Sequence, residues 1–350
     1  MKQDFIDKIQ DIIGNQNTDE RKLLFQLQEA IIDAELQYTT VSDSKSIADL
    51  VSANLTHLKE GSPQSTLIKT GFTEFDKLFG GFSLGELVVI GGRPAMGKTQ
   101  LLVNLSLYIS QTTPVLYFTF DLSEYSLTSR FISSMSGIAA NKIVLHELTN
   151  EEKDTLLSIG NTFSTRKILV NDSCSNSLSA FRAHCQRQIE EHGVKVIVID
   201  YLQLMSANKH RHSREHEISH ISRELKNIAK DLNVCVIAAS QLSRAVEFRG
   251  GSRHPQLCDL RESGAIEQDA DKVIFVYRPE YYGIDCDEEG NDTAGLTELL
   301  IAKNRNGSLG QIKLMRDANF TSYRDFDGYK SAFTFSKSRL DEIDNPFLNQ

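Results

Sequence analysis

Short runs of apolar, often β-branched residues recur along the chain from about residue 65 onward. The runs are continuous rather than alternating, which is typical of strands covered on both faces. Between them, apolar residues recur at helical spacing, as Ile218, Ile221 and Leu225 do. This alternation predicts an α/β fold with a mostly parallel, doubly wound sheet. The predicted strands are residues 87–90, 115–120, 167–170, 194–199, 234–239, 272–276 and 299–302.

The first 60 or so residues have a different pattern, polar overall with three apolar stripes at helical spacing. The stripes lie within residues 5–13, 23–34 and 47–58, and a Gly-Ser-Pro sequence follows them at 61–63. Such a sequence favours a domain boundary. Because short amphipathic helices form a thin core, we expect the stripes to dock on the main domain or on a neighbouring chain. The expected organisation is a helical arm over 1–62, a main domain over 63–335 and a tail over 336–350.

Composition limits the class of protein. The 350 residues include 40% hydrophobic residues, enough for a full core. No apolar stretch approaches the ~18 residues that span a bilayer, and the N-terminus lacks the apolar core of a signal peptide. The five cysteines include no CxxC pair, which fits a reducing compartment. We therefore expect a cytoplasmic protein with no membrane partner.

The charge balance is acidic, with 38 Lys and Arg against 47 Asp and Glu and a net charge of −9. Nucleic-acid-binding domains are often strongly basic, so this balance argues at first against such a partner. Residues 284–292 alone hold five carboxylates in nine positions. A solvated loop is the commoner explanation of such a run, and a metal site is the alternative.

The strongest chemical signal is a GxxxxGK[ST] motif between a predicted strand and a predicted helix. Its glycines allow backbone N–H groups to surround phosphate oxygens, and the following helix adds the partial positive charge of its N-terminus. Lys98 would reach the β- and γ-phosphates of ATP, and the Thr99 hydroxyl would bind Mg²⁺. The candidate nucleotide-binding residues are Gly92, Arg93, Pro94, Ala95, Met96, Gly97, Lys98, Thr99 and Gln100.

Three polar residues close predicted strands and complete the candidate site. Asp200 follows an apolar run, which places it at the carboxyl edge of the sheet, where it could bind Mg²⁺. Asp121 ends the strand after the motif and is the candidate to activate water. Gln241 is placed to sense the γ-phosphate. Each could instead be an ordinary polar residue at a strand end.

The motifs together resemble the RecA-like motor domain of the DnaB family of replicative DNA helicases. The matching sequences run in family order over residues 66–325, and DYLQLM, DLRESGAIEQDAD and KNRNG are the most specific of them. The resemblance implies a hexameric ring that moves along single-stranded DNA, usually 5′ to 3′, at the expense of ATP. A loader or a primase is the further partner to expect.

The resemblance also implies roles for basic residues. Lys303 and Arg305 resemble a pair that reaches into the neighbouring subunit's site, where a cation stabilises charge on the transferring phosphoryl group. Two segments are candidates to hold the DNA backbone. For each, and for the basic pair, a solvated turn is the alternative. The candidate DNA-binding residues are Arg261, Glu262, Gly264, Lys209, Arg211 and Arg214.

Two departures from the family pattern leave an alternative open. The family's general base is a glutamate where this chain has Asp121, whose carboxylate is about 1.5 Å shorter in reach, and Glu124 is a weaker substitute. Because only some 65 residues precede the motor domain, we also expect the family's larger N-terminal helical domain to be missing. The leading hypothesis is an ATP-driven DNA helicase, and the alternative is a paralogue with weak hydrolysis acting as loader, regulator or defence component. In a ring only the lumen must be basic, which reconciles the acidic balance with DNA.

Overall fold

The computed structural model describes residues 2–14, 23, 26–27, 30, 46–59, 67–173, 177–205, 214–250, 253–260, 264–287, 290–317 and 319–326. The chain divides into two compact units, Met1–Ser65 and Thr66–Gln350. The tail predicted from residue 336 lies outside the described residues, as does most of the second predicted apolar stripe.

The first unit contains two described helices, α1 (Lys2–Gly14) and α3 (Ile47–Lys59). They coincide with the first and third predicted stripes. On α3, Ile47, Val51 and Leu55 recur every fourth residue and are exposed. Residues spaced in this way lie on one face of a helix, so α3 carries an uncovered apolar stripe.

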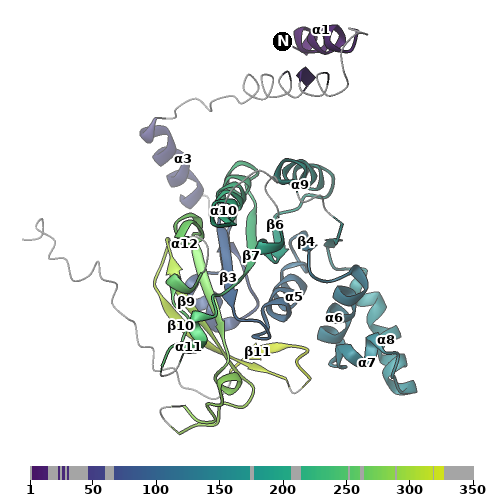
Figure 1. Cartoon of the computed structure of the whole chain (residues 1–350), viewed down its shortest axis with the longest axis vertical. Helices are drawn as coiled ribbons and strands as arrows, with labels where there is room; N and C mark the ends of the chain where they lie inside the picture. The colour runs from purple at the N-terminus through teal and green to yellow at the C-terminus, as the bar shows by residue number, and fades with distance from the viewer. Residues whose placement is uncertain are drawn as a thin grey trace, which may run out of the picture. The chain divides into compact units, whose positions relative to one another are not determined.

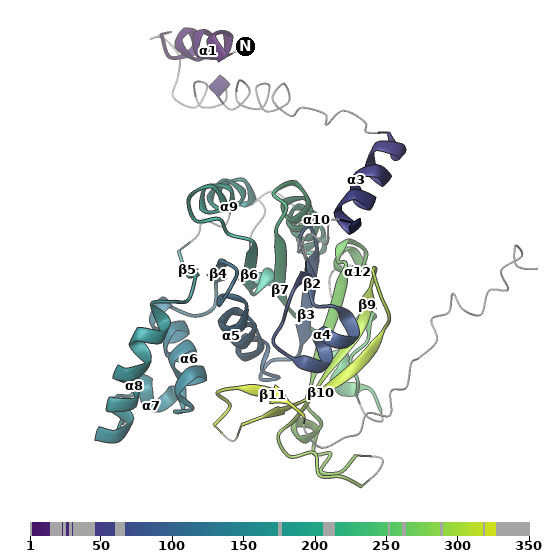
Figure 2. The same ribbon diagram turned by 180° about the vertical axis from the view of Figure 1, so that it is seen from behind.

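The second unit is built on a sheet that has nine strands in its described part, in the order β11-β10-β9-β8-β3-β7-β6-β4-β5 (Figures 1 and 2). The six strands from β8 to β5 are parallel to one another. The other three are added antiparallel beside β8. The strands are β3 (Leu87–Gly92), β4 (Val115–Thr119), β5 (Ile168–Asn171), β6 (Val196–Asp200), β7 (Cys235–Gln241), β8 (Lys272–Tyr277), β9 (Leu296–Asn304), β10 (Gly310–Arg316) and β11 (Tyr323–Asp325). A separate two-stranded sheet joins β1 (Leu67–Ile68) to β2 (Phe82–Ser83).

Helices cover both faces of the sheet. The α-helices are α4 (Thr73–Phe79), α5 (Lys98–Ile109), α6 (Glu124–Ser136), α7 (Ala140–Val144), α8 (Asn150–Phe163), α9 (Leu178–His192), α10 (Arg214–Asp231), α11 (Ala245–Phe248) and α12 (Gly264–Asp269). Short 3₁₀ helices follow three strands or loops: η1 (Leu202–Leu204), η2 (Leu257–Asp259) and η3 (Pro279–Tyr282).

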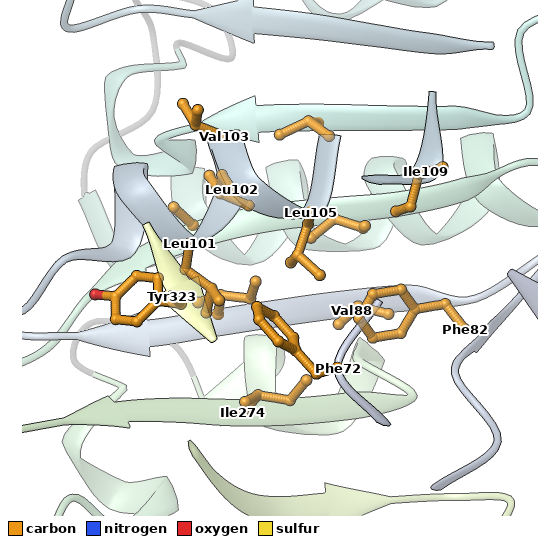
Figure 3. Packing of buried hydrophobic residues seen from close by; sticks show 14 of the residues in the cluster. Phe72, Phe82, Val88, Leu101, Leu102, Val103, Leu105, Ile109, Ile274 and Tyr323 are labelled. Atoms are coloured by element: carbon orange, nitrogen blue, oxygen red, sulfur yellow. The ribbon is translucent and has the colours of Figure 1, made fainter. Parts of the chain in front are cut away.

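Successive residues of the inner strands point to two different cores. Val88 of β3 belongs to a cluster with residues of α5 such as Leu101 and Leu105, and Figure 3 shows it next to Phe82. Val89, its neighbour, belongs to the opposite cluster, with residues of α9, α10 and α12. All six residues of β3 are buried. Burial on both faces explains why this strand has no polar alternation.

The predicted fold class is confirmed, since parallel strands alternate with helices on both faces of the sheet. All seven predicted strands are present, with ends shifted by up to three residues. The sequence pattern did not identify β1, β2, β10 or β11. The first two contain two residues each, and β10 buries only Ile312 and Leu314, so it lacks a continuous apolar run.

Candidate functional site

The GxxxxGK[ST] loop joins the end of β3 to the start of α5, at the carboxyl edge of the parallel strands. Gly97 is the N-cap residue of α5, with φ of 94°, and no side chain caps the helix there. A Cβ at Gly97 would lie 2.1 Å from the Tyr323 hydroxyl, so only glycine fits. The first N–H groups of α5 therefore remain available to an anion such as a phosphate.

Lys98 spans this loop. Its Nζ donates hydrogen bonds to the carbonyl oxygens of Gly92 (2.8 Å) and Arg93 (3.0 Å). Burial lowers the pKa of Lys98 from 10.5 to about 8, although the charges of Asp200 and Asp121 oppose this. A buried ammonium group with a lowered pKa is poised to bind a polyanion, because phosphate oxygens would stabilise its charged form.

Asp200 is the last residue of β6 and is 3% exposed. Burial raises its pKa, while the hydroxyl groups of Thr99 and Tyr117 and the charge of Lys98 act in the opposite direction. Tyr117 donates a hydrogen bond to Asp200 at 3.1 Å. A buried carboxylate beside a threonine hydroxyl is the oxygen donor set that Mg²⁺ prefers. Thr99 and Asp200 therefore fit a Mg²⁺ ion that accompanies a nucleotide.

Asp121 lies two residues beyond the end of β4, whose Thr119 pairs with Asp200 of β6. The Thr119 side chain fixes this turn, because its hydroxyl donates to the Leu122 carbonyl (2.9 Å) and accepts from the Leu122 N–H (3.1 Å). Asp121 is exposed, and its charge acts on Lys98 and Asp200. Glu124 begins α6, and its N–H bonds to Asp172. Of the two carboxylates, Asp121 is the one whose charge reaches both residues.

Gln241 ends β7 and is held by Gln203, which sequence analysis did not single out. The amide group of Gln203 donates to the Ser240 hydroxyl (2.9 Å) and accepts from the Gln241 N–H (3.2 Å). Gln203 lies in η1, three residues after Asp200. The strand ends that carry Asp200 and Gln241 are thus connected by one side chain. The sequence signal for Gln203 was the DYLQLM motif, which contains this residue.

The Arg93 side chain faces away from the position expected for phosphate. Its guanidinium group is 7% exposed, forms a salt bridge with Glu247 of α11 at 2.8 Å, and donates to the Leu242 carbonyl at 2.8 Å. Arg93 therefore fastens the nucleotide loop to the segment that follows Gln241. Its predicted role in nucleotide binding stays a prediction.

A second group of residues that sequence analysis missed supports the loop from the antiparallel side of the sheet. Arg278, directly after β8, donates to the Ala95 carbonyl at 2.8 Å. Arg278 and Arg316 both pair with Glu280 and both lie against the Phe320 ring. Despite burial, which opposes the shift, the Gly295 N–H and the two guanidinium groups lower the pKa of Glu280. The sequence signal that could have identified Arg278 was its position after a predicted strand.

Lys303 and Arg305 lie where the parallel strands begin, opposite the carboxyl edge that carries the nucleotide loop. Because β9 is antiparallel to β8, Lys303 pairs with Val273 near the start of β8. The Arg305 N–H bonds to the Asp271 carbonyl, and the Asp271 N–H bonds to the Leu87 carbonyl at the start of β3. Five residues of β3 separate that position from Gly92, or about 16 Å at roughly 3.3 Å per residue. The basic pair therefore does not reach the nucleotide loop of its own chain.

The predicted DNA-binding residues are described only in part. Lys209, Arg211, Arg261 and Glu262 lie outside the described residues. Gly264 is exposed at the first position of α12.

Arg214, the first residue of α10, binds within its own chain. It donates to the Gln203 and Met205 carbonyls and pairs with Glu217. Arg214 thus connects the start of α10 to η1 and to Met205. Its predicted role in DNA binding stays a prediction.

In the acidic run, Asp287 pairs with Lys313 and Asn291, as a solvated loop would. Within the described ranges, no cluster of histidine, cysteine or carboxylate residues could hold a metal ion by itself. No helix in the part of the chain that the structure describes has the length and apolar character to cross a membrane.

Comparison with known proteins places these features in a family. Residues 68–325 match the family described as DnaB-like helicase C terminal domain. A probable replicative DNA helicase of Trieres chinensis is 38% identical over 312 residues, which are 86% of this chain and 68% of that protein. Replicative DNA helicase DnaB of Geobacillus stearothermophilus is 38% identical over 264 residues, or 75% of this chain. The chain spans only 57% of that bacterial relative's length.

A solved structure is also similar. It is a DnaB-like replicative helicase, studied for its interactions with primase, and it superposes with a TM-score of 0.75 at 30% sequence identity. The similarity covers 93% of this chain and 76% of that one. The similarity to known helicases thus extends well beyond a short motif. It covers a chain that has this fold, the loop at the carboxyl edge and the separated basic pair.

Proposed function

The chain belongs to the DnaB-like helicase family, and from that premise we propose that it is an ATP-hydrolysing DNA helicase that moves along single-stranded DNA during replication. The relatives it matches carry the name replicative DNA helicase, so a weakly hydrolysing paralogue is not favoured. The four described cysteines are free thiols, which fits action in the cytoplasm.

ATP is the proposed nucleotide and Mg²⁺ its ion. The loop from Gly92 to Thr99 and the start of α5 would surround the phosphates, with Lys98 at the β- and γ-phosphates. Thr99 and Asp200 would hold Mg²⁺, which neutralises charge on the phosphate oxygens when bound. Asp121 would accept a proton from the attacking water, and Gln241 would contact the γ-phosphate from the end of β7.

The observation that carries the proposal is the separation of Lys98 from Lys303 and Arg305 along the sheet. A cation near the transferring phosphoryl group stabilises the charge that develops there. Since the pair lies at the far edge from its own nucleotide loop, it would complete the site of another copy. This arrangement supports a closed assembly of identical subunits, which we propose is a hexameric ring.

The DNA would pass through the centre of this ring and be held by two segments, 206–213 and 261–264. The first segment follows η1, whose Gln203 accepts a hydrogen bond from the Gln241 N–H. The second follows Asp259, whose carbonyl accepts from the N–H of Ser243, two residues after Gln241. Contacts of local loops with the backbone suffice for a motor that does not select sequence. The net charge of −9 is compatible with this, because only the lumen must be basic.

Further contacts are proposed for the arm and for other proteins. The exposed stripe of Ile47, Val51 and Leu55 on α3 would dock on a neighbouring subunit and strengthen the ring. A loader that opens the ring, or a primase, is the proposed partner of the assembly. The solved helicase that resembles this chain was studied with primase.

Measurements of ATP hydrolysis and strand unwinding test the proposal. We expect single-stranded DNA to stimulate hydrolysis by the intact protein, and Lys98→Ala to abolish both hydrolysis and unwinding. Lys142→Ala is the control, because this half-exposed lysine pairs with Glu152 of α8. Hydrolysis that depends on Lys98 but does not respond to DNA would contradict the proposal.

A further inference from the structure

A network of polar side chains lies at the edge where the parallel strands begin, and it surrounds the base of the turn that carries Arg305. Its centre is Asp271, which precedes β8 and is 6% exposed. Asp271 Oδ2 accepts hydrogen bonds from the Leu87 N–H (2.8 Å) and from Lys226 Nζ of α10 (2.7 Å). Asp271 Oδ1 lies 3.3 Å from Arg305 Nη1. One carboxylate oxygen therefore makes contacts within the fold, and the other contacts Arg305.

Arg305 is held in place here by only some of the N–H donors of its guanidinium group. Its side chain is 45% exposed, and besides Asp271 it donates to the Gln268 carbonyl through Nη2. A guanidinium group has five N–H donors in a fixed plane. The two contacts account for one donor on each Nη, so the remaining donors can reach a phosphate while Asp271 fixes the plane of the group.

The turn itself is fastened by a neighbouring ion pair. Asn306, the next residue after Arg305, donates to Glu86 Oε1 at 3.0 Å. Glu86 Oε2 pairs with Lys272 at 2.6 Å, and both side chains are at most 5% exposed. The residue after Arg305 is thus connected to Glu86, directly before β3, and the residue before it pairs with Lys272 of β8, which limits how far the arginine can move.

We propose that Asp271 is a positioning residue that orients Arg305 toward the nucleotide of the neighbouring subunit, with Lys226 fixing the carboxylate. The inference rests on the proposed function, in which Arg305 acts on another copy. Asp271 touches neither nucleotide nor DNA in this account. It fixes the guanidinium plane in advance, which preserves the geometry that transition-state stabilisation requires.

Asp271→Asn is the informative substitution. Leu87 N–H and Lys226 both require an acceptor, so the asparagine oxygen takes their side and its NH₂ group faces Arg305. The variant can keep the hydrogen bonds from Leu87 and Lys226, without the negative charge that pairs with Lys226, and it loses the contact to Arg305. We expect kcat for DNA-stimulated ATP hydrolysis to fall by about 10- to 100-fold with KM for ATP within about twofold, since misplacement by 1 Å can cost 100-fold.

Asp231→Asn provides the matched control. Asp231 is also paired with an arginine, Arg182, at 2.9 Å, but this pair is exposed and joins the last residue of α10 to α9. We expect wild-type kcat from this variant. If Asp231→Asn lowers kcat as much as Asp271→Asn, the loss of any ion pair accounts for the effect and the proposal is wrong.

A double-mutant cycle with Arg305→Ala separates positioning from a role in folding. If Asp271 acts through Arg305, Asp271→Asn changes kcat by less than about twofold once Arg305 is alanine. An equal loss in both backgrounds would overturn the proposal. Wild-type kcat from Arg305→Ala would instead contradict the proposed function. A loss with Arg305→Ala but none with Asp271→Asn would overturn this inference and leave the proposed function standing.

Discussion

The two edges of the same sheet are built in opposite ways. At the carboxyl edge, Arg93 of the nucleotide loop pairs with Glu247. Lys98 of the same loop bonds to two carbonyl oxygens and, within the described part of the chain, forms no ion pair with a carboxylate. At the amino edge, charged side chains are paired with one another, as in Glu86–Lys272 and Lys226–Asp271. One edge is left ready for an anion that the chain does not supply. The other edge is closed, with Arg305 presented outward.

Under the proposed function, this difference would explain why one copy of the chain is insufficient. The groups that bind phosphate and the cations expected to stabilise its transfer are separated by the length of β3. A rigid sheet does not bring its two edges together. In the proposed function, Lys303 and Arg305 at the amino edge would act beside the carboxyl edge of another subunit.

The largest expected difference between the edges concerns stability. Lys272→Met should lower the free energy of unfolding by about 3–5 kcal/mol, because it leaves Glu86 buried without its partner. Lys98→Met should not lower it, because burial already disfavours the charge of Lys98. Urea unfolding of the two variants measures both values. Equal destabilisation would remove the distinction between the edges.

The next effect concerns the length of one side chain at the carboxyl edge. Asp121→Glu should raise kcat for ATP hydrolysis by up to about 100-fold, because the longer side chain brings its carboxylate closer to the attacking water. Steady-state kinetics with saturating single-stranded DNA measures the change. Glu124→Gln is the control and should leave kcat unchanged, since this residue begins α6. A fall in kcat with Asp121→Glu would show that the turn already places the shorter side chain correctly.

The smallest expected effect is the uptake of a fraction of a proton when nucleotide binds. Without nucleotide, Lys98 has a pKa of about 8, below its usual 10.5. Phosphate raises this pKa, so binding should take up about half a proton at pH 8 and almost none at pH 6. Calorimetry in buffers of different ionisation enthalpy measures the uptake. Equal uptake at both pH values would contradict the lowered pKa.

The lowered pKa of Lys98 also makes the stability of the fold depend on pH. Between pH 8 and 10.5 the unfolded chain binds more protons at Lys98 than the folded one. Stability from this group therefore rises with pH across that window, and below pH 8 the charged lysine carries its full cost of burial. Lys98→Met should remove this dependence.

The inner strands were predictable from sequence because burial on both faces leaves only apolar residues, as in β3. The antiparallel strands were harder. In β10, Lys313 and Gln311 alternate with buried residues, so the strand resembles an exposed segment. Strand-end rules placed Asp200 and Gln241 at the correct edge, because a side chain after a buried strand lies there whatever the details of packing.

Contacts between distant segments were not predictable. Arg278 reaches Ala95 across 183 positions of sequence, and Asn306 reaches Glu86 across 220. Neither contact leaves a periodic signal, because each depends on which strands become neighbours. The sequence contained Lys303 and Arg305 as a motif, but only the antiparallel register of β9 places them away from their own nucleotide loop.

The central claim is that each site is completed between copies, and mixing of two inactive variants tests it most directly. Lys98→Ala retains Arg305, and Arg305→Ala retains Lys98. In an equal mixture about a quarter of the interfaces join the intact halves, because each half is intact in one subunit of two. A mixture of Lys98→Ala with the Lys98→Ala/Arg305→Ala double variant is the control, since no interface there has an intact nucleotide loop.

The account predicts that ATP hydrolysis in the first mixture rises well above the sum of the two variants measured alone, while the control mixture stays inactive. Native mass spectrometry should confirm that the subunits have mixed. Mixed assemblies with no recovery of hydrolysis would contradict the claim that the two edges meet at a shared site.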